Sequence, residues 1–377
     1  MQHFPTHRAT AAVSISALRQ NYFSLAALAA KNATGEQSPR IIAVVKANAY
    51  GHGVELVVPA LLSAGCSFFA VATVEEALTL RALAPVADIL ILGYTPPHHA
   101  RELAVGRLLQ TVFSGEYAHA LSACAKAAEV TVNVHLKIDG GMCRLGFSPE
   151  AVEEIAAAAT LPHLCAKGIY THFPSADRDL AGTRAAFLRF LSCKGALAAR
   201  GLSLFSHAAA SAALLTFPEM ALDGARVGLA LYGIAPTKTT LPLRPAMTLT
   251  APVVQIREVA ANTPVGYGGS FITTRKTKIG TLPIGYADGV PRRFGKAVGG
   301  VRVLTKKGAF FAPVAGNICM DQMMIDLTDT PIGIGDRAVF FDRITEAATA
   351  LETIPYELLT GVGSRVLRIR ENERNEY

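Results

Sequence analysis

The chain has 377 residues, of which 51% are hydrophobic and 17% charged, and its net charge is +7. This composition excludes an intrinsically disordered protein, and the length exceeds what one core usually holds, so we expect two domains. We find no apolar run of membrane-spanning length and no signal peptide, and we expect a cytoplasmic protein without membrane association. The positive charge comes without basic blocks interleaved with aromatic residues, so we do not expect nucleic-acid binding, whereas a positive pocket for an anionic ligand would fit.

The six cysteines show no Cys-x-x-Cys spacing, which indicates reduced thiols of a cytoplasmic protein and predicts no metal site. They are Cys66, Cys124, Cys143, Cys165, Cys193 and Cys319.

The N-terminal part of the chain predicts a strand and then a helix. A strand is expected at Ala11–Ile15, and a helix is expected over about Ser16–Ala30. We expect this strand to pair with a second domain further along the chain.

Eight short apolar strands then alternate with Ala-rich helical stretches. The expected strands are Ile41–Val45, Phe68–Ala72, Asp88–Leu92, Leu108–Phe113, Val132–Ile138, Ala166–Thr171, Leu204–Ala208 and Arg226–Tyr232. Thr73 and Glu76 predict a capping box for a helix over Val74–Leu83, and Ser148 with Pro149 predicts the start of another helix. Eight such units favour a (β/α)8 barrel; the alternative is an open doubly wound sheet, whose dinucleotide-binding form lacks its Gly-x-Gly-x-x-Gly sequence here.

Helical periodicity fades after about residue 245, and short strands separated by turn residues follow. They are expected at Val253–Val259, Lys278–Pro283, Val301–Leu304, Met323–Leu327 and Arg337–Phe341. The sequence therefore predicts an α/β protein: a (β/α)8 barrel over residues 15–245, followed by a mainly β C-terminal domain over residues 246–377 that also includes residues 1–14.

Lys46 directly follows the first apolar, β-branched strand of the expected barrel. Burial of an amine at the end of a strand lowers its pKa and makes it a nucleophile toward carbonyl compounds. The alternative is a lysine that extends to solvent from the strand end, and this segment alone does not separate the two interpretations.

Other polar residues fall near the carboxyl ends of the expected strands, where barrel enzymes place their active sites. They are Lys46, Lys137, Arg144, His172, Ser211 and Arg226. Such a set would make an anion site, to which the backbone amides of Gly228 and Leu229 could add donors. Taken singly, Arg144 could be a solvated loop residue, His172 a core histidine and Ser211 a helix cap.

Eight segments distributed along the chain form a distinctive ordered set: AVVKANAYGHG (43–53), HLKIDGGMCRLG (135–146), YTHF (170–173), RVGLALYG (226–233), VGYG (265–268), PIGYADG (283–289), CMDQ (319–322) and IPYE (354–357). Together they resemble the alanine racemases, a family that uses pyridoxal 5'-phosphate. The resemblance covers nearly the whole chain, and it implies a racemase that interconverts L-alanine and D-alanine and supplies D-alanine for peptidoglycan.

The resemblance also implies roles for single residues. Lys46 matches the lysine that holds the cofactor covalently, and Arg226 matches the partner of its pyridine nitrogen, with His172 beside that arginine. The cofactor's phosphate ligands match Tyr50, Ser211, Tyr356 and the amides of Gly228 and Leu229.

Arg144 matches the arginine that faces the cofactor's phenolic oxygen and the substrate carboxylate. Lys137 matches a lysine that is carbamylated in the family. Two bare cations in one pocket would repel, which suggests a use for the modification.

Racemisation needs a proton removed from one face of Cα and returned to the other, so two bases are expected. By resemblance these are Lys46 and Tyr267, although a tyrosine with its ordinary pKa of about 10 is a poor base unless cations lower it. Tyr267 and the amide of Met320 would come from the partner subunit of a homodimer with shared sites, and Tyr286 would gate the passage to the site.

Three positions depart from the commoner family pattern. Ala210 stands where asparagine is frequent, Cys143 where glycine is frequent, and Leu367 where proline is frequent. The alternatives are a serine or broad-specificity racemase or a decarboxylase of basic amino acids with the same fold, and a non-catalytic protein that binds pyridoxal phosphate.

Overall fold

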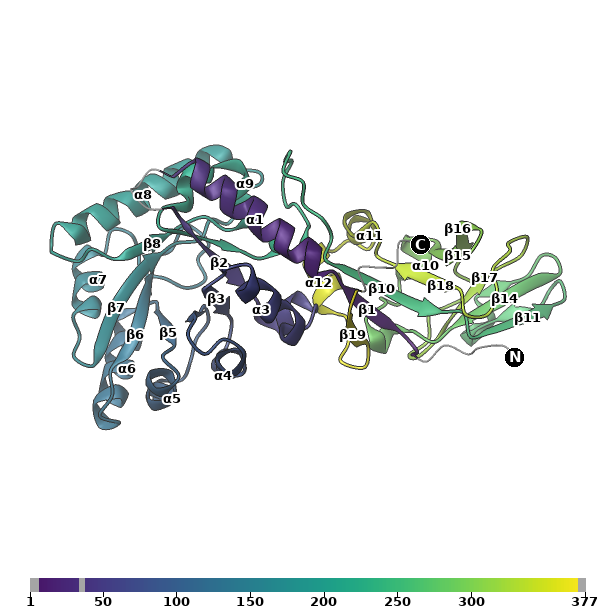
Figure 1. Ribbon diagram of the computed structural model, residues 1–377, viewed down its shortest axis with the longest axis horizontal. Coiled ribbons are helices and arrows are strands. Elements are labelled where there is room, and N and C mark those ends of the chain that lie inside the picture. The colour runs from purple at the N-terminus through teal and green to yellow at the C-terminus, as the bar shows by residue number, and fades with distance from the viewer. Residues whose placement is uncertain (1–6, 34–37, 372–377) are drawn as a thin grey trace. The chain divides into compact units, whose positions relative to one another are not determined.

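The computed structural model describes residues 7–33 and 38–371 (Figure 1). The chain divides into two compact units. The barrel unit contains Ser16–Ala49 and Val57–Arg244, and the strand unit contains the described parts of Met1–Ile15, Tyr50–Leu56 and Pro245–Tyr377. We describe each unit by itself.

The barrel unit is built on eight parallel strands in the order β8-β7-β6-β5-β4-β3-β2-β9. Their bounds are β2 Arg40–Val44, β3 Phe68–Val71, β4 Asp88–Ile91, β5 Leu109–Val112, β6 Val132–Lys137, β7 Leu164–Tyr170, β8 Phe205–His207 and β9 Gly224–Val227. The two ends of the sheet meet, since Asp223 N donates to Ser206 O and Arg226 N donates to Ala209 O, both at 2.9 Å. The expected (β/α)8 barrel is therefore confirmed.

Helices surround the strands of this unit (Figure 1). They are α1 Ile15–Lys31, α3 Val54–Ser63, α4 Val74–Leu83, α5 Ala100–Val105, α6 Gly115–Ala127, α7 Val152–Ala159, α8 Leu180–Ala198 and α9 Ser211–Thr216, with 3-10 turns η1 Pro97–His99, η2 Pro218–Ala221 and η3 Leu229–Tyr232. Among the described residues, no helix is both long and apolar enough to cross a bilayer.

Two expectations for this unit were wrong. The strand expected at Arg226–Tyr232 ends at Val227, and the apolar residues after it form η3 instead, so Arg226 lies near the carboxyl end of its strand. Ser148 does not cap a helix: its hydroxyl donates to Glu150, and α7 begins at Val152 after Ala151. The Ser148 side chain makes this local hydrogen bond in place of a helix cap.

The strand unit contains two main sheets and a short two-stranded one. The first has the order β16-β15-β18-β10-β1-β19, the second β11-β14-β17 and the third β12-β13. The bounds are β1 Thr10–Val13, β10 Met247–Pro252, β11 Gln255–Val259, β12 Pro264–Val265, β13 Phe271–Ile272, β14 Thr277–Leu282, β15 Gly300–Thr305, β16 Gly308–Pro313, β17 Met323–Asp326, β18 Arg337–Phe340 and β19 Leu367–Arg370. β1 pairs with β10 and β19, which confirms that the N-terminal strand joins this sheet.

Val253–Val259 is not one strand. At Val253 and Val254 the chain leaves the first sheet for the second, because Val253 N donates to Asp336 O and Val254 N donates to Thr281 O. No glycine or proline lies between Val253 and Val259, so the sequence there gives no sign of such a change of partner. β16 and β19 were also missed, since half or more of each strand is not buried and neither has a strong apolar pattern.

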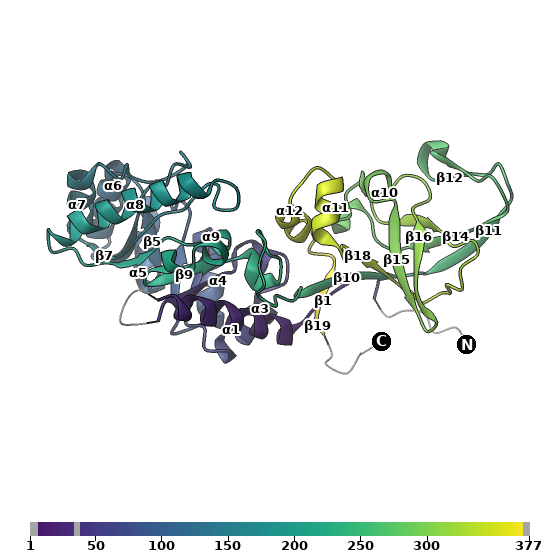
Figure 2. The ribbon, with the colours of Figure 1, turned by 90° about the horizontal axis from the view of Figure 1, so that it is seen from above.

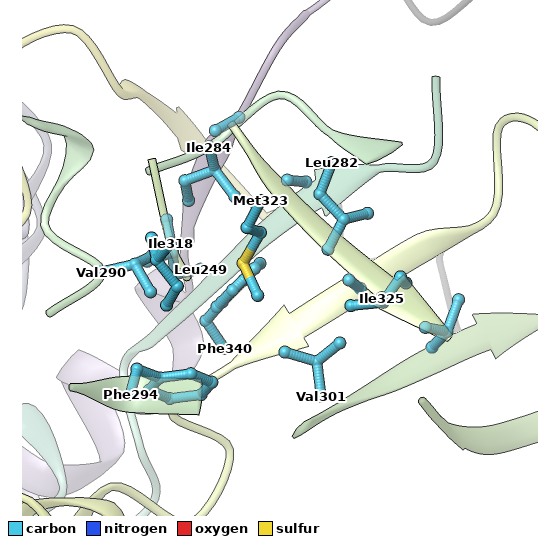
Figure 3. Close-up of a cluster of buried hydrophobic side chains, with 14 of the residues drawn as sticks. Leu249, Leu282, Ile284, Val290, Phe294, Val301, Ile318, Met323, Ile325 and Phe340 are labelled. Atoms are coloured by element: carbon cyan, nitrogen blue, oxygen red, sulfur yellow. The ribbon is translucent and has the colours of Figure 1, made fainter. Parts of the chain in front are cut away.

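The core of the strand unit lies between its sheets and short helices. Figure 3 shows Met323, Ile325, Leu249 and Phe340 packed together with the Phe294 ring. The helices are α10 Phe294–Ala297, α11 Ile344–Ala350 and α12 Pro355–Thr360, with 3-10 turns η4 Tyr267–Gly269 and η5 Tyr286–Asp288. Figure 2 shows α10 and α11 beside the strands β15 and β18, so this small unit buries its apolar faces on both strands and helices.

The segment Tyr50–Leu56 belongs to the strand unit although it lies between barrel strands in the sequence. Gly51 has φ +78°, and a Cβ there would lie 2.1 Å from Leu359 O. Arg368 Nε donates to Gly51 O at 3.0 Å. Only glycine permits this approach of two backbones.

Candidate active site

The carboxyl end of β2 turns directly into a left-handed helical turn, α2, over Lys46–Tyr50. Ala47, Asn48, Ala49 and Tyr50 have φ between 52 and 53°. Each such residue costs about 1 kcal/mol or more relative to a right-handed conformation. Strain of this kind persists only where surrounding contacts impose it, and it is typical of functional sites.

Glu76 is one of the contacts that impose this turn. Its Oε1 accepts a hydrogen bond from Ala47 N at 2.7 Å, and its Oε2 accepts one from Ala72 N at 2.8 Å. Thr73 caps α4 through Glu76 N as expected, but the glutamate carboxylate reaches these two loop amides and completes no capping box. One carboxylate therefore links the ends of β2 and β3.

The amine of Lys46 is half-buried, and its pKa is lowered. Desolvation is the largest cause and Arg144 adds to it, whereas Glu76 acts in the opposite direction. A lowered pKa increases the fraction of neutral, nucleophilic amine near pH 7.

Arg226, on β9, is buried and makes an unusually complete set of bonds. Nη1 donates to His207 Nδ1 at 2.7 Å and His207 O at 3.0 Å, while Nη2 donates to Thr171 O at 2.6 Å and Ala208 O at 3.0 Å. His172 Nδ1 lies 3.5 Å from Nη2. The four terminal N–H groups are thus directed at four acceptors, and among the described residues Nε–H has none.

Burial lowers the pKa of Arg226 to about 10, so the guanidinium stays charged near pH 7. Desolvation and this cation lower the pKa of His172 to about 3 and that of His207 well below its usual value. Both imidazoles are therefore neutral. Because Arg226 can only donate, His207 Nδ1 must accept, and its proton sits on Nε2.

The proton on His207 Nε2 extends this chain of hydrogen bonds to a second histidine. His207 Nε2 lies 3.0 Å from Nδ1 of the buried His135, whose pKa is lowered to about 3 by desolvation and by Arg226. His207 Nε2–H donates, so His135 Nδ1 accepts and the proton of this second neutral ring lies on its Nε2. Arg226 fixes the tautomers of both histidines.

The ring of Tyr170 lies against His207 and close to two buried cations. Its ring stacks on His207 with centroids 4.7 Å apart and planes at 7°. Arg226 Cζ lies 5.0 Å and Lys137 Nζ 5.5 Å from its centroid. Aromatic faces attract cations, which offsets part of the cost of burying two of them.

Lys137 is 6% exposed, and its Nζ donates to Ile138 O at 2.5 Å. Desolvation and then Arg226 lower its pKa to about 7; Asp139 opposes them, and Arg144 adds a smaller lowering. Near neutral pH roughly half of such amines are uncharged.

The loop after β6 carries Arg144 and is folded around Asp139. The two carboxylate oxygens accept from the amides of Gly141, Met142 and Cys143 at 3.0 to 3.2 Å. Arg144 is exposed and has no hydrogen bond to a described residue, yet its charge lowers the pKa values of Lys46, Lys137 and His172.

Cys143 has φ 52°, which gives a physical reason why glycine suits this position. The cysteine adopts a conformation that glycine takes at less cost.

Ser211 and Gly228 converge at the start of α9. Ser211 Oγ accepts from Gly228 N at 3.0 Å and from Ala230 N at 3.4 Å. Ser211 is the first residue of α9, and Ala210 stands at the N-cap with no side chain able to cap. Leu229, next to Gly228, opens η3 with its backbone buried in the same corner.

In the strand unit, Tyr50 and Tyr356 form a pair with ring centroids 5.8 Å apart. Tyr50 is 7% exposed, and desolvation raises its pKa, with a smaller contribution from Tyr356. The Tyr50 phenol therefore remains neutral at neutral pH.

A second group of the strand unit is exposed. Tyr267 is 76%, Met320 52% and Tyr286 43% exposed. The loop Asn317–Met320 joins them: Asn317 Nδ2 donates to Tyr267 O at 3.3 Å, and Tyr286 N donates to Cys319 O at 3.1 Å.

The structure therefore brings together Lys46, Lys137, Arg144, His172 and Arg226, whose charges act on one another. Ser211, Gly228 and Leu229 form a separate corner of the barrel unit, at the start of α9 and η3. The strand unit holds the other expected residues in two groups, Tyr50 with Tyr356 and Tyr267 with Tyr286 and Met320. The sequence analysis missed Glu76, Tyr170 and His207 as contributors. His207 ends β8 and Tyr170 ends β7, so their place at strand ends was the available signal.

No group of three or more His, Cys, Asp or Glu side chains suited to a metal ion occurs in residues 7–33 and 38–371.

Two protein-family models match most of the chain. Residues 13–236 match the family model "Alanine racemase, N-terminal domain" and residues 246–370 match "Alanine racemase, C-terminal domain". An alanine racemase of Desulfosudis oleivorans is 38% identical, with 96% of each chain covered.

Solved structures are similar as well. Alanine racemase of Clostridium difficile 630 superposes with a TM-score of 0.88 at 34% identity, covering 96% of this chain and 95% of the other. Alanine racemase of Bartonella henselae with covalently bound pyridoxal phosphate gives 0.84 at 29% identity, covering 97% and 100%. This chain belongs to the alanine racemase family of isomerases.

Proposed function

We propose that this protein interconverts L-alanine and D-alanine with pyridoxal 5'-phosphate attached to Lys46. The observation that carries the proposal is the lowered pKa of the Lys46 amine at the end of β2, where Lys46 and Arg226 both act on the pKa of His172. The relative from Bartonella henselae, which is described with covalently bound pyridoxal phosphate, supports the choice of cofactor.

The donor set of the barrel unit fits this cofactor. Arg226 has its Nε–H left after four bonds to the protein, and a pyridine nitrogen is an acceptor. Ser211 and the amides of Gly228 and Leu229 are neutral donors, whose bonds to a phosphate would be charge-assisted; the Gly228 amide would give up its bond to Ser211 Oγ to make one. Tyr50 and Tyr356, which pair within the strand unit, would supply two further neutral donors, both phenols.

When bound, pyridoxal phosphate would withdraw electrons from the Cα–H bond of the amino acid and so make its proton removable. Arg226 cannot accept a proton, so it would leave the pyridine nitrogen unprotonated and moderate that withdrawal. His172 and His207 stay neutral beside it and add no further charge.

Two side chains of the protein would move the proton. Lys46 would serve the D face of Cα, and its lowered pKa suits a base at neutral pH. Tyr267 of a second copy would serve the L face. Its 76% exposure supports this, because the side chain is available to another chain.

Arg144 would bind the substrate carboxylate, with the Met320 amide of the second copy alongside. A carbamate on Lys137 would turn this cation into an anion and orient Arg144. The pKa of about 7 supports that modification, since the neutral amine is the form that reacts with carbon dioxide. Tyr286, 43% exposed, would gate the passage to the site.

The assembly would be a homodimer in which each site combines the barrel unit of one chain with the strand unit of the other. The enzyme would work in the cytoplasm and supply D-alanine for peptidoglycan. The relatives' names, all alanine racemases, support the substrate.

One test is borohydride reduction of the purified protein, followed by peptide mass mapping. The second, on a separate unreduced sample, is a racemisation assay on a panel of L-amino acids. We expect the reduced cofactor on Lys46 and turnover fastest with alanine. Adduct on another lysine would reject the assignment of Lys46, and faster turnover of serine would reject the substrate.

A further inference from the structure

A cavity of about 400 Å³ opens at the end of the barrel opposite Lys46. Several lining residues begin their strands: Arg40 opens β2, Asp88 opens β4 and Phe205 opens β8. The amino end of such barrels usually serves stability only. A hollow of this size with the following lining is therefore unexpected there.

The lining is strongly positive. It includes the cations Arg40, Arg81, Arg107 and Lys167 and one carboxylate, Asp88, so four positive charges less one negative leave three. Asp88 is already paired with Arg40 at 2.8 Å. Clefts lined by one sign of charge concentrate ions of the opposite sign.

Arg81 has a structural role. Its guanidinium donates to the carbonyl groups of Ala84, Ala87 and Gly106, at 2.7 to 2.9 Å, and of Arg107 at 3.0 Å. It adds charge to the cavity but few free donors. Lys167 is different: it is exposed and makes no hydrogen bond or ion pair to any described residue.

A β-bulge presents Lys167 to the cavity. Val134 pairs with Ala166 and His135 pairs with Gly168, so Lys167 is an extra residue in β7. Bulges redirect side chains, and they are frequent at the rims of barrels and beside binding sites. The next residue must be glycine, because a Cβ at Gly168 would lie 2.5 Å from the His135 ring.

His135 supplies a second, buried donor. It is 2% exposed and lines the cavity. Its Nδ1 accepts from His207, as the chain from Arg226 dictates, so its proton is on Nε2. Among the described residues nothing accepts from Nε2, which leaves this N–H as a donor for a cavity ligand.

We propose that this cavity binds a small organic oxyanion of the phosphate monoester class, held by Lys167 and by His135 Nε2–H. The volume exceeds what an inorganic phosphate needs and lies within the range of small-molecule sites. The rings of Phe68 and Phe205, which also line it, offer apolar surface to the organic part. The ligand would then be hydrogen-bonded, through two histidines, to Arg226 at the other end of the barrel.

The experiment titrates the cofactor-saturated protein with glycerol 3-phosphate and, separately, with inorganic phosphate at constant ionic strength, using calorimetry. Saturation with cofactor keeps the other phosphate site filled. Lys167→Gln should weaken binding of glycerol 3-phosphate by about tenfold, the effect of losing one charge-assisted hydrogen bond. Lys126→Gln, the same change at an exposed position of α6 outside the cavity, should leave it unchanged.

Nitrogen NMR of histidine-labelled protein gives a readout that a general charge effect would not move. Glycerol 3-phosphate should shift the Nε2–H signal of His135 in both proteins, with half of the shift reached at about tenfold higher ligand concentration in Lys167→Gln. Equal binding by both variants, or binding without a shift at His135, would overturn the proposal. Equal affinity for inorganic phosphate and the monoester would overturn only the statement that the ligand carries an organic group.

Discussion

The two units carry their polar residues in opposite environments. In the barrel unit Lys137 is 6% and Arg226 4% exposed, and burial displaces the pKa of each. In the strand unit Tyr267 is 76% and Met320 52% exposed. The barrel unit therefore buries its own charged groups, whereas the Tyr267 group is open to solvent in its own unit. If Tyr267 serves as a base, as proposed above, cations of another chain would have to lie close to it. This asymmetry is what a shared site in a dimer would require.

The strongest test of this difference between the units removes the two proposed bases one at a time. Lys46→Ala and Tyr267→Phe should each lower kcat for alanine racemisation by about 10³-fold or more, because each removes one proton-transfer group. Subunit exchange between the two inactive variants should restore up to a quarter of the parent's activity per site, roughly, since one site of a hybrid dimer keeps both groups.

The control for this experiment is a mixture of two samples of the same variant, which should stay inactive. Demonstrated hybrids that gain nothing would show that Tyr267 acts within its own chain or not at all.

A second prediction concerns Arg226, whose guanidinium donates four buried hydrogen bonds in the barrel unit. Arg226→Lys keeps the charge but cannot reach four acceptors in one plane. We expect a loss of about 3 kcal/mol in unfolding free energy, because buried carbonyl groups lose their donors. Denaturant unfolding measures it, and Arg275→Lys, at an exposed ion pair, is the matched control. Equal stability of the two variants would contradict the central role of Arg226.

Much of the barrel was predictable from the sequence because parallel strands buried on both faces are continuous apolar runs, as in Phe68–Val71. The polar residues that end such runs, among them Lys46 and Lys137, identified one end of the barrel. In contrast, η3 has the same apolar composition as a strand, and only the backbone of Gly228 at φ −113° and ψ −95° ends β9 there.

Other features could not be read from local pattern. Glu76 matches a capping box in sequence, and its bonds to Ala47 and Ala72 depend on two strand ends meeting in space. The left-handed turn at Ala47–Tyr50 contains alanines, which have no intrinsic preference for it. Tertiary contacts impose the left-handed conformation, so the sequence of the turn does not predict it.

A third prediction uses the lowered pKa of Lys137, about 7 in the folded chain against 10.5 for an ordinary lysine. The unfolded chain binds more protons between these values, so stability should rise as the pH increases from about 7 to 10.5. Thermal unfolding in buffer free of carbon dioxide should show this rise in the parent relative to Lys137→Met, which lacks it. Parallel curves for the two proteins would mean that the amine is not desolvated.

Glu76→Gln tests the contact that holds the strained turn. Glutamine offers one acceptor oxygen where two amides need one each, so Lys46 should be less well positioned and kcat should fall by about tenfold. Loss of the carboxylate also removes the effect that raises the pKa of Lys46, so the acid limb of the kcat profile should move to lower pH. Glu75→Gln, on the same helix and exposed, is the control. A fall in kcat without the shift would indicate a purely structural role.

The smallest expected effect lies at Ala210, the residue before the phosphate-binding serine proposed here. It occupies the N-cap of α9 with an extended backbone, φ −102° and ψ −174°, and its methyl group cannot accept from the first free amides of the helix. Asparagine can, and such a cap contributes about 1 kcal/mol. Ala210→Asn should therefore raise the melting temperature of the cofactor-free protein by a few degrees, roughly, for a domain of this size. Ala213→Asn, inside the same helix and buried, should lower it instead. A cap that stabilises α9 also holds Ser211 more firmly, so cofactor should dissociate more slowly from Ala210→Asn than from the parent. Unchanged melting temperature and release rate would show that the Gly228 and Ala230 amides, which already bond to Ser211, fix this corner without a cap.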